Sequence, residues 1–360
     1  MAQAGAAGAA FAGAWGGHYP RRAMKIGLVY ELFGAYPRRP GDPPDAQVEY
    51  EPEDTLLGLE AAIGRLGHRP VRLGRPHDLL AAAAKGAVAV DAALSIAEGY
   101  GSRNREAWAP VLLEMLGVPQ LGSDALTLSL SLDKAWTRAV VAEAGVRVAP
   151  GRVVHSEAEV WQGDGLPELP CFVKPRWEGS SKGIGLASRV DDRAALAAAV
   201  ARVVRDYGQP ALVERFLPGP EYTVTLIGND PPRALPVLQR ALEAHTRIGL
   251  HAVEPKPGEE PAAAPAAGLG HVVPGTLHPA LEAELVAQAV RAFRALECRD
   301  FARADFKCDE AGRPVFLEIN PLPTFAPDGS FGVHAALLGR PFEDLLAEVL
   351  NEGLRRLGLA

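Results

Sequence analysis

The sequence has few cysteines and no spaced set of metal-binding histidines. Three cysteines, Cys171, Cys298 and Cys308, occur among 360 residues, and none belongs to a CxxC pair. The nine histidines are scattered without HExxH or a similar spacing. These absences argue against a disulfide-stapled secreted domain and against a zinc enzyme. They favour a reducing compartment, and we expect the protein to be cytoplasmic.

Long apolar runs and an excess of positive charge are also lacking. No apolar run approaches the ~20 residues that a membrane-spanning helix needs. Lys plus Arg number 37 against 44 for Asp plus Glu, a net charge of −7. Neither a membrane protein nor a nucleic-acid scaffold is therefore expected. Hydrophobic residues make up 48% of the chain, enough for sizeable cores. The length predicts two or three domains of roughly 100–200 residues each.

The chain divides into a tail and an alternation of strand-like and helix-like segments. Residues 1–23 are rich in Ala and Gly, and their arginines follow the apolar stretch, so we expect a disordered tail and not a signal peptide. From Met24, the apolar run KIGLVY and a helical pattern from Thr55 to Leu66 begin a β-α-β-α alternation. This order predicts a parallel sheet covered by helices, in a domain that ends at residue 122.

The remainder predicts further strands and helices. We expect helices at residues 131–145, 192–207 and 281–296, and strands at 171–175, 185–190, 301–308 and 314–320. The last two strands form a hairpin. Residues 254–275 are rich in Pro, Ala and Gly with almost no period, which predicts a long mobile loop.

Acidic residues face one another across the predicted hairpin. If Asp309 pairs with Pro314, Asp305 lies directly opposite Glu318, and Asn320 shares the face of Glu318. Opposed carboxylates are destabilising unless something cationic lies between them. Two carboxylates and an amide oxygen are the hard ligands that Mg²⁺ prefers. The alternative is a solvated hairpin face, and we favour the metal site because the acids occupy strand interiors.

A glycine loop and a strand-to-turn segment suit a nucleotide. Residues 178–185, EGSSKGIG, can present backbone N–H groups and two hydroxyls to phosphate oxygens. The loop lacks GxxxxGK[ST], and alone it is equally compatible with a flexible hairpin. Lys174, which ends the preceding strand, favours a phosphate clamp. Glu214 and Glu221 flank a Pro-Gly turn where backbone and carboxylates can meet adenine and ribose, although acids flank turns commonly.

Together these segments resemble the D-alanine–D-alanine ligase family of the ATP-grasp superfamily. The resemblance spans residues 24–360 and is carried, in order, by LLEMLGVPQLGSDALTLSLSLDKAWTR, FVKPRWEGSSKG, LVERFLPGPEYTV and FARADFKCDEAGRPVFLEIN. It implies an α/β protein, α+β in its ATP-binding part, with an ATP-grasp fold preceded by a Rossmann-like domain. The implied domains are residues 24–122, 123–213 and 214–360, with ATP held between the last two.

The resemblance also implies roles for individual residues. ATP phosphates would contact Lys134, Lys174 and a flap of Glu178, Gly179, Ser180 and Ser181. The nucleoside would contact Glu214, the backbone of Arg215, Phe216 and Leu217, and Glu221. Two Mg²⁺ ions, or Mn²⁺, would be bound by Asp305, Glu318 and Asn320. The catalytic groups would be Arg303, Ser180, Ser330 at the second substrate's carboxylate, and Lys256 in place of a lid lysine.

Departures from the family pattern fall in the amino-acid pocket. The family's His-Gly…Glu-Asp-Gly segment reads Ala-Glu-Gly-Tyr-Gly-Ser-Arg-Asn-Arg-Glu at residues 97–106. An anionic Glu98 in place of a histidine should face an ammonium or pair with Arg103 or Arg105. The family's Asn-Thr-x-Pro-Gly reads Asn-Pro-Leu-Pro-Thr at residues 320–324, with one extra residue before Ser330. The glutamate that grips the first substrate's ammonium has three possible counterparts: Glu49, Glu51 and Glu53.

We therefore expect an ATP- and Mg²⁺-dependent carboxylate–amine ligase that forms a dipeptide through an acyl phosphate. Synthesis of D-alanyl-D-alanine for peptidoglycan is the leading hypothesis, although the departures predict weak activity on D-alanine. A ligase for other amino acids or a specialised metabolite is one alternative, and a nucleotide-sensing module without turnover is another. The expected partners are small amino acids, with no nucleic acid and no membrane, and the resemblance is compatible with a homodimer.

Overall fold

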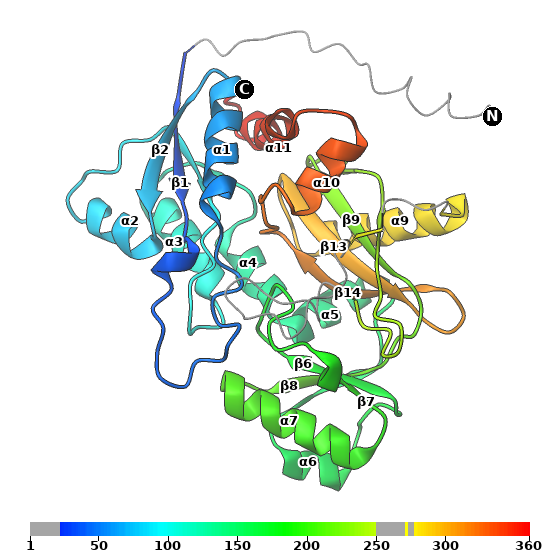
Figure 1. Ribbon diagram of the computed structural model, residues 1–360. Helices are drawn as coiled ribbons and strands as arrows, with labels where there is room; N and C mark the ends of the chain where they lie inside the picture. Colours follow the sequence, from blue (N-terminus) through cyan, green and yellow to red (C-terminus); the bar gives the residue numbers. More distant parts are fainter. Residues whose placement is uncertain (1–21, 250–270, 273–276) are drawn as a thin grey trace.

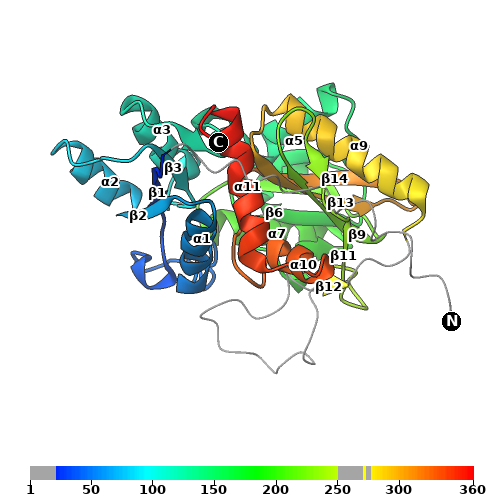
Figure 2. The same ribbon diagram turned by 90° about the horizontal axis from the view of Figure 1, so that it is seen from above.

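The structure, a computed structural model, describes residues 22–249, 271–272 and 277–360. Three sheets flanked by helices make up the described chain (Figures 1 and 2). Residues 1–21 of the expected tail and nearly all of the expected loop at 254–275 lie outside the described residues. In the described part, no helix combines the length and apolar character needed to cross a membrane.

The N-terminal sheet is parallel, as the β-α-β-α pattern predicts. Its order is β2–β1–β3–β4, with β1 (Lys25–Val29), β2 (Arg69–Gly74), β3 (Ala92–Ser95) and β4 (Gln120–Leu121). The accompanying helices are α1 (Glu53–Arg65), α2 (Pro76–Ala83) and α3 (Trp108–Met115). Acids in the first turn of α1 favour its start, because they complement the helix dipole. Gly67, with a φ of 77°, follows its end.

The central sheet is antiparallel, and its helices cover one face (Figure 1). Its order is β5–β8–β6–β7, with β5 (Gly151–Val154), β6 (Cys171–Pro175), β7 (Arg189–Val190) and β8 (Ala211–Arg215); the helices are α6 (Glu157–Gln162) and α7 (Arg193–Tyr207). The expected strand at 185–190 is wrong for most of its length. Residues 186–188 form a 3-10 turn, because the Gly185 N–H donates to the Ser188 hydroxyl at 3.1 Å.

The C-terminal sheet packs its core against one long helix. Its order is β12–β11–β9–β13–β14, and β10 pairs with β9; the strands are β9 (Glu221–Ile227), β10 (Arg233–Ala234), β11 (Leu238–Arg240), β12 (His271–Val272), β13 (Phe301–Cys308) and β14 (Pro314–Asn320). The helix α9 (Pro279–Ala295) packs on this sheet through Phe293, which shares a core with Phe306 and Phe316.

The helix expected at 131–145 is present as α5 (Lys134–Glu143), but it begins three residues later than expected. α4 (Ala125–Leu132) ends before Asp133, and α5 begins after it. The Asp133 carboxylate accepts hydrogen bonds from Ala135 N and Trp136 N, both at 3.2 Å, as an N-cap does. Its extended backbone therefore starts a new helix, and Lys134 becomes the first residue of α5.

The hairpin of β13 and β14 places its acids as predicted, by a different register. Asp305 lies opposite Glu318. The expected pairing of Asp309 with Pro314 is wrong, because Cys308 lies opposite Pro314. A bulge next to Asp305 shifts the register by one residue and brings the two carboxylates opposite one another.

The last helices return to the N-terminal domain. α10 (Ser330–Leu337) leads into α11 (Phe342–Arg356), which lies beside α1 in both views (Figures 1 and 2). Leu346 and Leu350 of α11 share a core with Leu59 and Ile63 of α1. This core fixes the N-terminal sheet relative to the C-terminal sheet. The boundaries 24–122, 123–213 and 214–360 stay a prediction.

Candidate functional site

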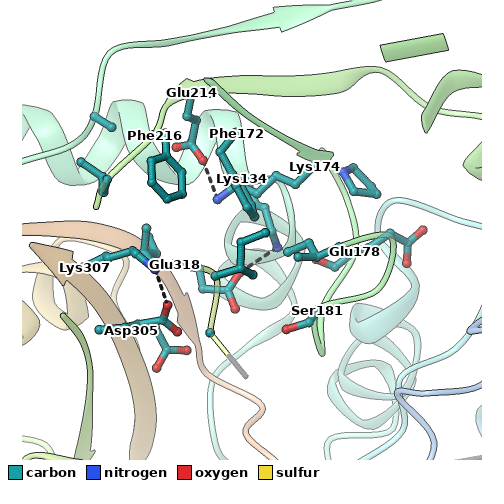
Figure 3. Close-up of a pocket in the computed structure, with 18 of the residues that line it drawn as sticks. Lys134, Phe172, Lys174, Glu178, Ser181, Glu214, Phe216, Asp305, Lys307 and Glu318 are labelled. Carbon is teal, nitrogen blue, oxygen red and sulfur yellow. Dashed lines mark hydrogen bonds and ion pairs between the residues drawn. The ribbon is translucent and has the colours of Figure 1, made fainter. Parts of the chain in front are cut away.

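A cavity of about 850 Å³ lies between the central and C-terminal sheets, and we call it the first cavity. Figure 3 shows side chains from β6, β8, α5, β13 and β14 around it. Most residues assigned to nucleotide or metal from the sequence line it: Lys134, Lys174, Glu178, Ser181, Glu214, Arg215, Phe216, Leu217, Glu221, Asp305 and Glu318. A mixed apolar and charged lining suits a nucleotide.

One end of the first cavity holds a buried ion-pair group. Glu214 on β8 lies 2.6 Å from Lys174 Nζ on β6 and 2.8 Å from Arg138 Nη1 on α5. Burial favours the neutral acid, but the two cations outweigh it and lower the pKa of Glu214. Sequence reasoning missed Arg138. Its spacing of four residues from Lys134 on one helix was the available signal.

Lys134 lies where the first cavity meets α5. It is the first residue of that helix, where the positive end of the helix dipole adds to its own charge and attracts anions. Its Nζ lies 3.0 Å from Glu318 and donates to the Glu178 carbonyl. Burial alone would raise the pKa of Glu318, but Lys134, Lys174 and Arg303 lower it to about 2. Glu318 therefore stays ionised at neutral pH.

The acids opposed across the hairpin form the candidate metal site. Asp305 accepts from the Thr223 hydroxyl at 2.6 Å and pairs with Arg303 at 3.0 Å. The amide nitrogen of Asn320 lies 3.4 Å from Glu318. Carboxylate and amide oxygens on adjacent strands fit Mg²⁺, which binds through one or two carboxylates plus substrate phosphates. No group of three His, Cys, Asp or Glu able to hold a metal occurs among the described residues, so phosphates would have to complete the coordination.

We call the whole glycine loop at residues 178–185 the flap from here on. The flap docks on the N-terminal domain. The Gly179 N–H donates to Glu49 at 2.7 Å, and the Gly183 N–H donates to Asp45 at 2.8 Å. Gly183 has a φ of 77°, and a Cβ there would lie 2.3 Å from Pro175 Cγ, so only glycine fits. Neither Asp45 nor this docking was expected from the sequence. We expect residues 179–185 to be mobile without nucleotide and ordered with it, because small residues leave the backbone free to close over phosphates.

A second cavity of about 1160 Å³ adjoins the first, and Lys134 lines both. Several residues expected at the reacting groups line it: Gly179, Ser180, Arg303 and Asn320. Its remaining charged lining is acidic: Glu49, Glu51, Glu98, Glu106 and Asp328. A charged cleft next to the first cavity suits an amino acid, which carries an ammonium and a carboxylate.

The structure separates the three glutamates that sequence left open. Glu53 is exposed and pairs with Arg72 at 2.8 Å, away from both cavities. Glu49 pairs with Arg105 at 2.8 Å and with Lys182, and these cations overcome burial and lower its pKa to about 2. Glu51 remains.

The Glu51 carboxylate accepts from the Thr55 and Thr324 hydroxyls at 2.8 and 3.1 Å. Burial raises its pKa. Glu51 has no ion pair with a described cation. Glu49 and Glu51 both line the second cavity, and of these two only Glu51 has a charge that no described cation neutralises.

Three other expectations have different outcomes. Ser330 is the first residue of α10, is buried, and lines neither cavity. Lys256 lies outside the described residues. The pairing of Glu98 with an arginine is wrong: Arg105 pairs with Glu49 and Glu178, and Arg103 lies 3.6 Å from Asp133. That Glu98 faces an ammonium stays a prediction.

Comparison with known proteins assigns the chain to a family. Residues 151–351 match the family model described as D-ala D-ala ligase C-terminus. A D-alanine–D-alanine ligase of Gluconobacter oxydans is 34% identical over 308 residues, which cover 84% of this chain and 95% of that protein. The chain belongs to the D-alanine–D-alanine ligase family.

Further similarities extend this assignment. An uncharacterised protein of Sinorhizobium fredii, y4sG, is 31% identical and covers 73% of this chain and 74% of its own. The crystal structure of the D-alanine–D-alanine ligase from Bacillus anthracis complexed with ATP superposes with a TM-score of 0.67 at 19% identity, covering 93% of this chain and 98% of that one. The fold is therefore the ATP-grasp fold after a Rossmann-like domain, and this member of the family is an ATP-dependent ligase that forms a peptide bond.

Proposed function

We infer that the protein joins two amino acids at the border of the two cavities, with Mg²⁺–ATP in the first cavity. A carboxylate of the first amino acid attacks the γ-phosphate, ADP leaves, and an acyl phosphate remains. The amine of the second amino acid then attacks the acyl carbon, and phosphate leaves. D-alanine is the first substrate to test, because the relative from Gluconobacter oxydans is a D-alanine–D-alanine ligase.

The observation that carries this proposal is the meeting of Lys134, Arg303, Asp305 and Glu318 between the two cavities. Phosphoryl transfer depends mainly on positioning and on charge stabilisation. The two cations would stabilise charge on the transferred phosphoryl and acyl groups. The two carboxylates would hold Mg²⁺, which when bound neutralises phosphate charge. Apolar Phe172 and the β8 backbone would receive the adenine.

The second cavity would hold the amino acids. Glu51 would bind the α-ammonium of the first one, since its carboxylate is held by hydroxyls and is not neutralised by a described cation. Ser180, on the flap beside Arg303 in the lining, would contact the reacting carboxylate. The ammonium end and the carboxylate end of the substrate would thereby have opposite-charge partners.

The test is ADP release with D- and L-amino acids, singly and in pairs, with mass spectrometry of the product. A dipeptide together with stoichiometric ADP supports the ligase reaction, and the amino acids in it define the substrates. Turnover with amino acids other than D-alanine keeps the reaction and changes its substrate. ATP binding without ADP release for any pair would contradict the proposed function and favour a nucleotide-sensing module.

A further inference from the structure

The second cavity is lined by more carboxyl groups than one amino-acid ammonium can pair with. Its two lining cations pair with the acids of the candidate metal site: Lys134 with Glu318 and Arg303 with Asp305, each at 3.0 Å. The acids that line the cavity and have no ion pair with a described cation are Glu51, Glu98, Glu106 and Asp328. Asp328 is exposed to solvent, whereas the other three are wholly or partly buried.

Among these acids, Glu106 gives the strongest evidence for a bound cation. It is only 7% exposed, lies in the 3-10 turn Arg105–Ala107, and its carboxylate forms no side-chain hydrogen bond or ion pair with a described residue. Its carboxylate oxygens are open to the cavity, since neither is among the fully enclosed polar atoms of the described chain. A buried carboxylate without a partner costs free energy, and a ligand cation is the partner that would offset this cost.

Glu98 lies close to Glu106. The chain packs tightly here, and a Cβ on Gly99 would lie 2.8 Å from Arg105 Cβ. Burial raises the pKa of Glu98 well above its ordinary value, and the nearby charge of Glu106 raises it further. Burial also raises the pKa of Glu106, to about 7 against the pull of Arg105. Because the carboxylates of Glu98 and Glu106 repel each other, one bound cation would stabilise both.

A metal ion does not suit this site. No three His, Cys, Asp or Glu side chains among the described residues converge closely enough to hold one. An organic ammonium or guanidinium needs only one or two carboxylates, which the lining of this cavity supplies. Glu51 is held by the Thr55 and Thr324 hydroxyls and would bind the α-ammonium. Glu98 and Glu106 therefore remain for a second positive group.

We propose that the amino acid bound in the second cavity carries a second positive charge on its side chain, which Glu98 and Glu106 bind. The substrate class is thus a diamino acid or another basic amino acid, and alanine leaves this part of the cavity unmatched. This proposal rests on the proposed ligase function, because it assigns the second cavity to an amino-acid substrate. It also explains physically why activity on D-alanine should be weak.

The first experiment compares basic amino acids with neutral amino acids of the same shape. Lysine is paired with norleucine and ornithine with norvaline, in both enantiomers, by ADP release and by calorimetric binding in the presence of a non-hydrolysable ATP analogue. We expect kcat/KM and affinity to favour the basic member by at least about tenfold, since a site built for a polar group discriminates strongly against its absence. Equal values for both members of every pair would overturn the proposal.

The second experiment removes the charges. Glu98→Gln and Glu106→Gln should each lower the preference for the basic member by about tenfold or more and spare the neutral one. Glu114→Gln, an exposed change on α3, serves as the control and should leave the preference unchanged. A preference that survives in the double variant, with native unfolding behaviour, would contradict the assignment of Glu98 and Glu106.

The two readouts distinguish the two proposals. ADP release with neutral amino acids alone would uphold the ligase reaction and overturn the basic-substrate inference. Selective binding of the basic members without ADP release for any pair would uphold the inferred charge recognition and overturn the ligase reaction.

Discussion

At the scale of single residues, Asp305 and Glu318 carry the metal prediction. Asp305→Asn or Glu318→Gln removes one unit of charge from the Mg²⁺–ATP complex while keeping side-chain shape. We expect kcat to fall by about 10²-fold or more, as losses of electrostatic stabilisation do. ADP release at saturating Mg²⁺ measures it. Glu310→Gln, in the exposed turn of the same hairpin, is the control and should change little. Unchanged turnover in both active-site variants would rule out this metal site.

Glu51 and Glu53 provide a matched pair for substrate binding. Glu51 is buried and lines the second cavity, whereas Glu53 is exposed and pairs with Arg72. We expect Glu51→Gln to raise KM for the first amino acid by about 10- to 100-fold, the effect of losing a charged hydrogen bond. Glu53→Gln should leave KM unchanged. Steady-state kinetics of ADP release measure both, and an equal effect of the two changes would contradict the role of Glu51.

Glu106 links stability to pH. Burial and the charge of Glu49 raise its pKa from 4.5 to about 7, while Arg105, Lys134 and Lys182 oppose the rise. The folded protein therefore holds this proton more tightly than the unfolded chain. The resulting stability is fully present below about pH 4.5 and is lost as the pH rises through about 7.

We therefore expect Glu106→Gln, which cannot ionise, to raise the free energy of unfolding at pH 8 by about 2 kcal/mol. The gain should shrink as the pH falls below 7. Urea denaturation between pH 5 and pH 8 measures this, with Glu114→Gln as a control of constant effect. A gain independent of pH would show that Glu106 does not titrate in this range.

At the scale of elements, local sequence patterns predicted the hairpin but not its register. The alternation in residues 301–308 and 314–320 gave both strands their bounds. The bulge beside Asp305 depends on pairing across the sheet, which no pattern within one strand reports. The break at Asp133 was similarly hidden, because α4 and α5 are both helical and only the N-cap divides them.

The flap is the element that we expect to close over the ATP phosphates. Asp45 accepts from the Gly183 N–H at 2.8 Å and from the Tyr207 hydroxyl at 2.9 Å. Asp45→Ala removes both acceptors, so amides of the flap should exchange faster, and a non-hydrolysable ATP analogue should restore protection. Hydrogen exchange with mass spectrometry measures this, with Asp42→Ala on the same loop as the control. Identical exchange with and without the analogue, in the native protein, would contradict closure over phosphates.

At the scale of the whole molecule, the order of segments predicted more than any single motif. The strings around Lys134, Lys174, Glu214 and Asp305 occupy distant parts of the chain, yet these residues line one cavity. What sequence did not predict is the ion-pair network of the flap. Some of its partners come from segments more than 70 residues apart, such as Arg105 with Glu178, and each charge alone resembles a solvated surface residue.

Asp300 links the N-terminal domain to the C-terminal part of the chain, and both parts line the second cavity. Fully buried, its carboxylate accepts from Gly122 N at 2.7 Å, at the end of the N-terminal domain, and from Arg356 Nε at 2.7 Å, on α11. It also accepts from the Asn229 amide at 3.1 Å, in the loop after β9.

Asp300→Ala would leave the Arg356 guanidinium without its carboxylate and break the link between the two domains. We expect a loss of about 3–5 kcal/mol in the free energy of unfolding, the cost of breaking a buried pair. Asp230→Ala, which removes the exposed pair with Arg294, should cost no more than about 1 kcal/mol. Urea denaturation of both variants measures the difference. Because the second cavity is lined by both domains, KM for the amino acid should rise in Asp300→Ala more than KM for ATP. Equal stability of the two variants would show that Asp300 does not hold the domains together.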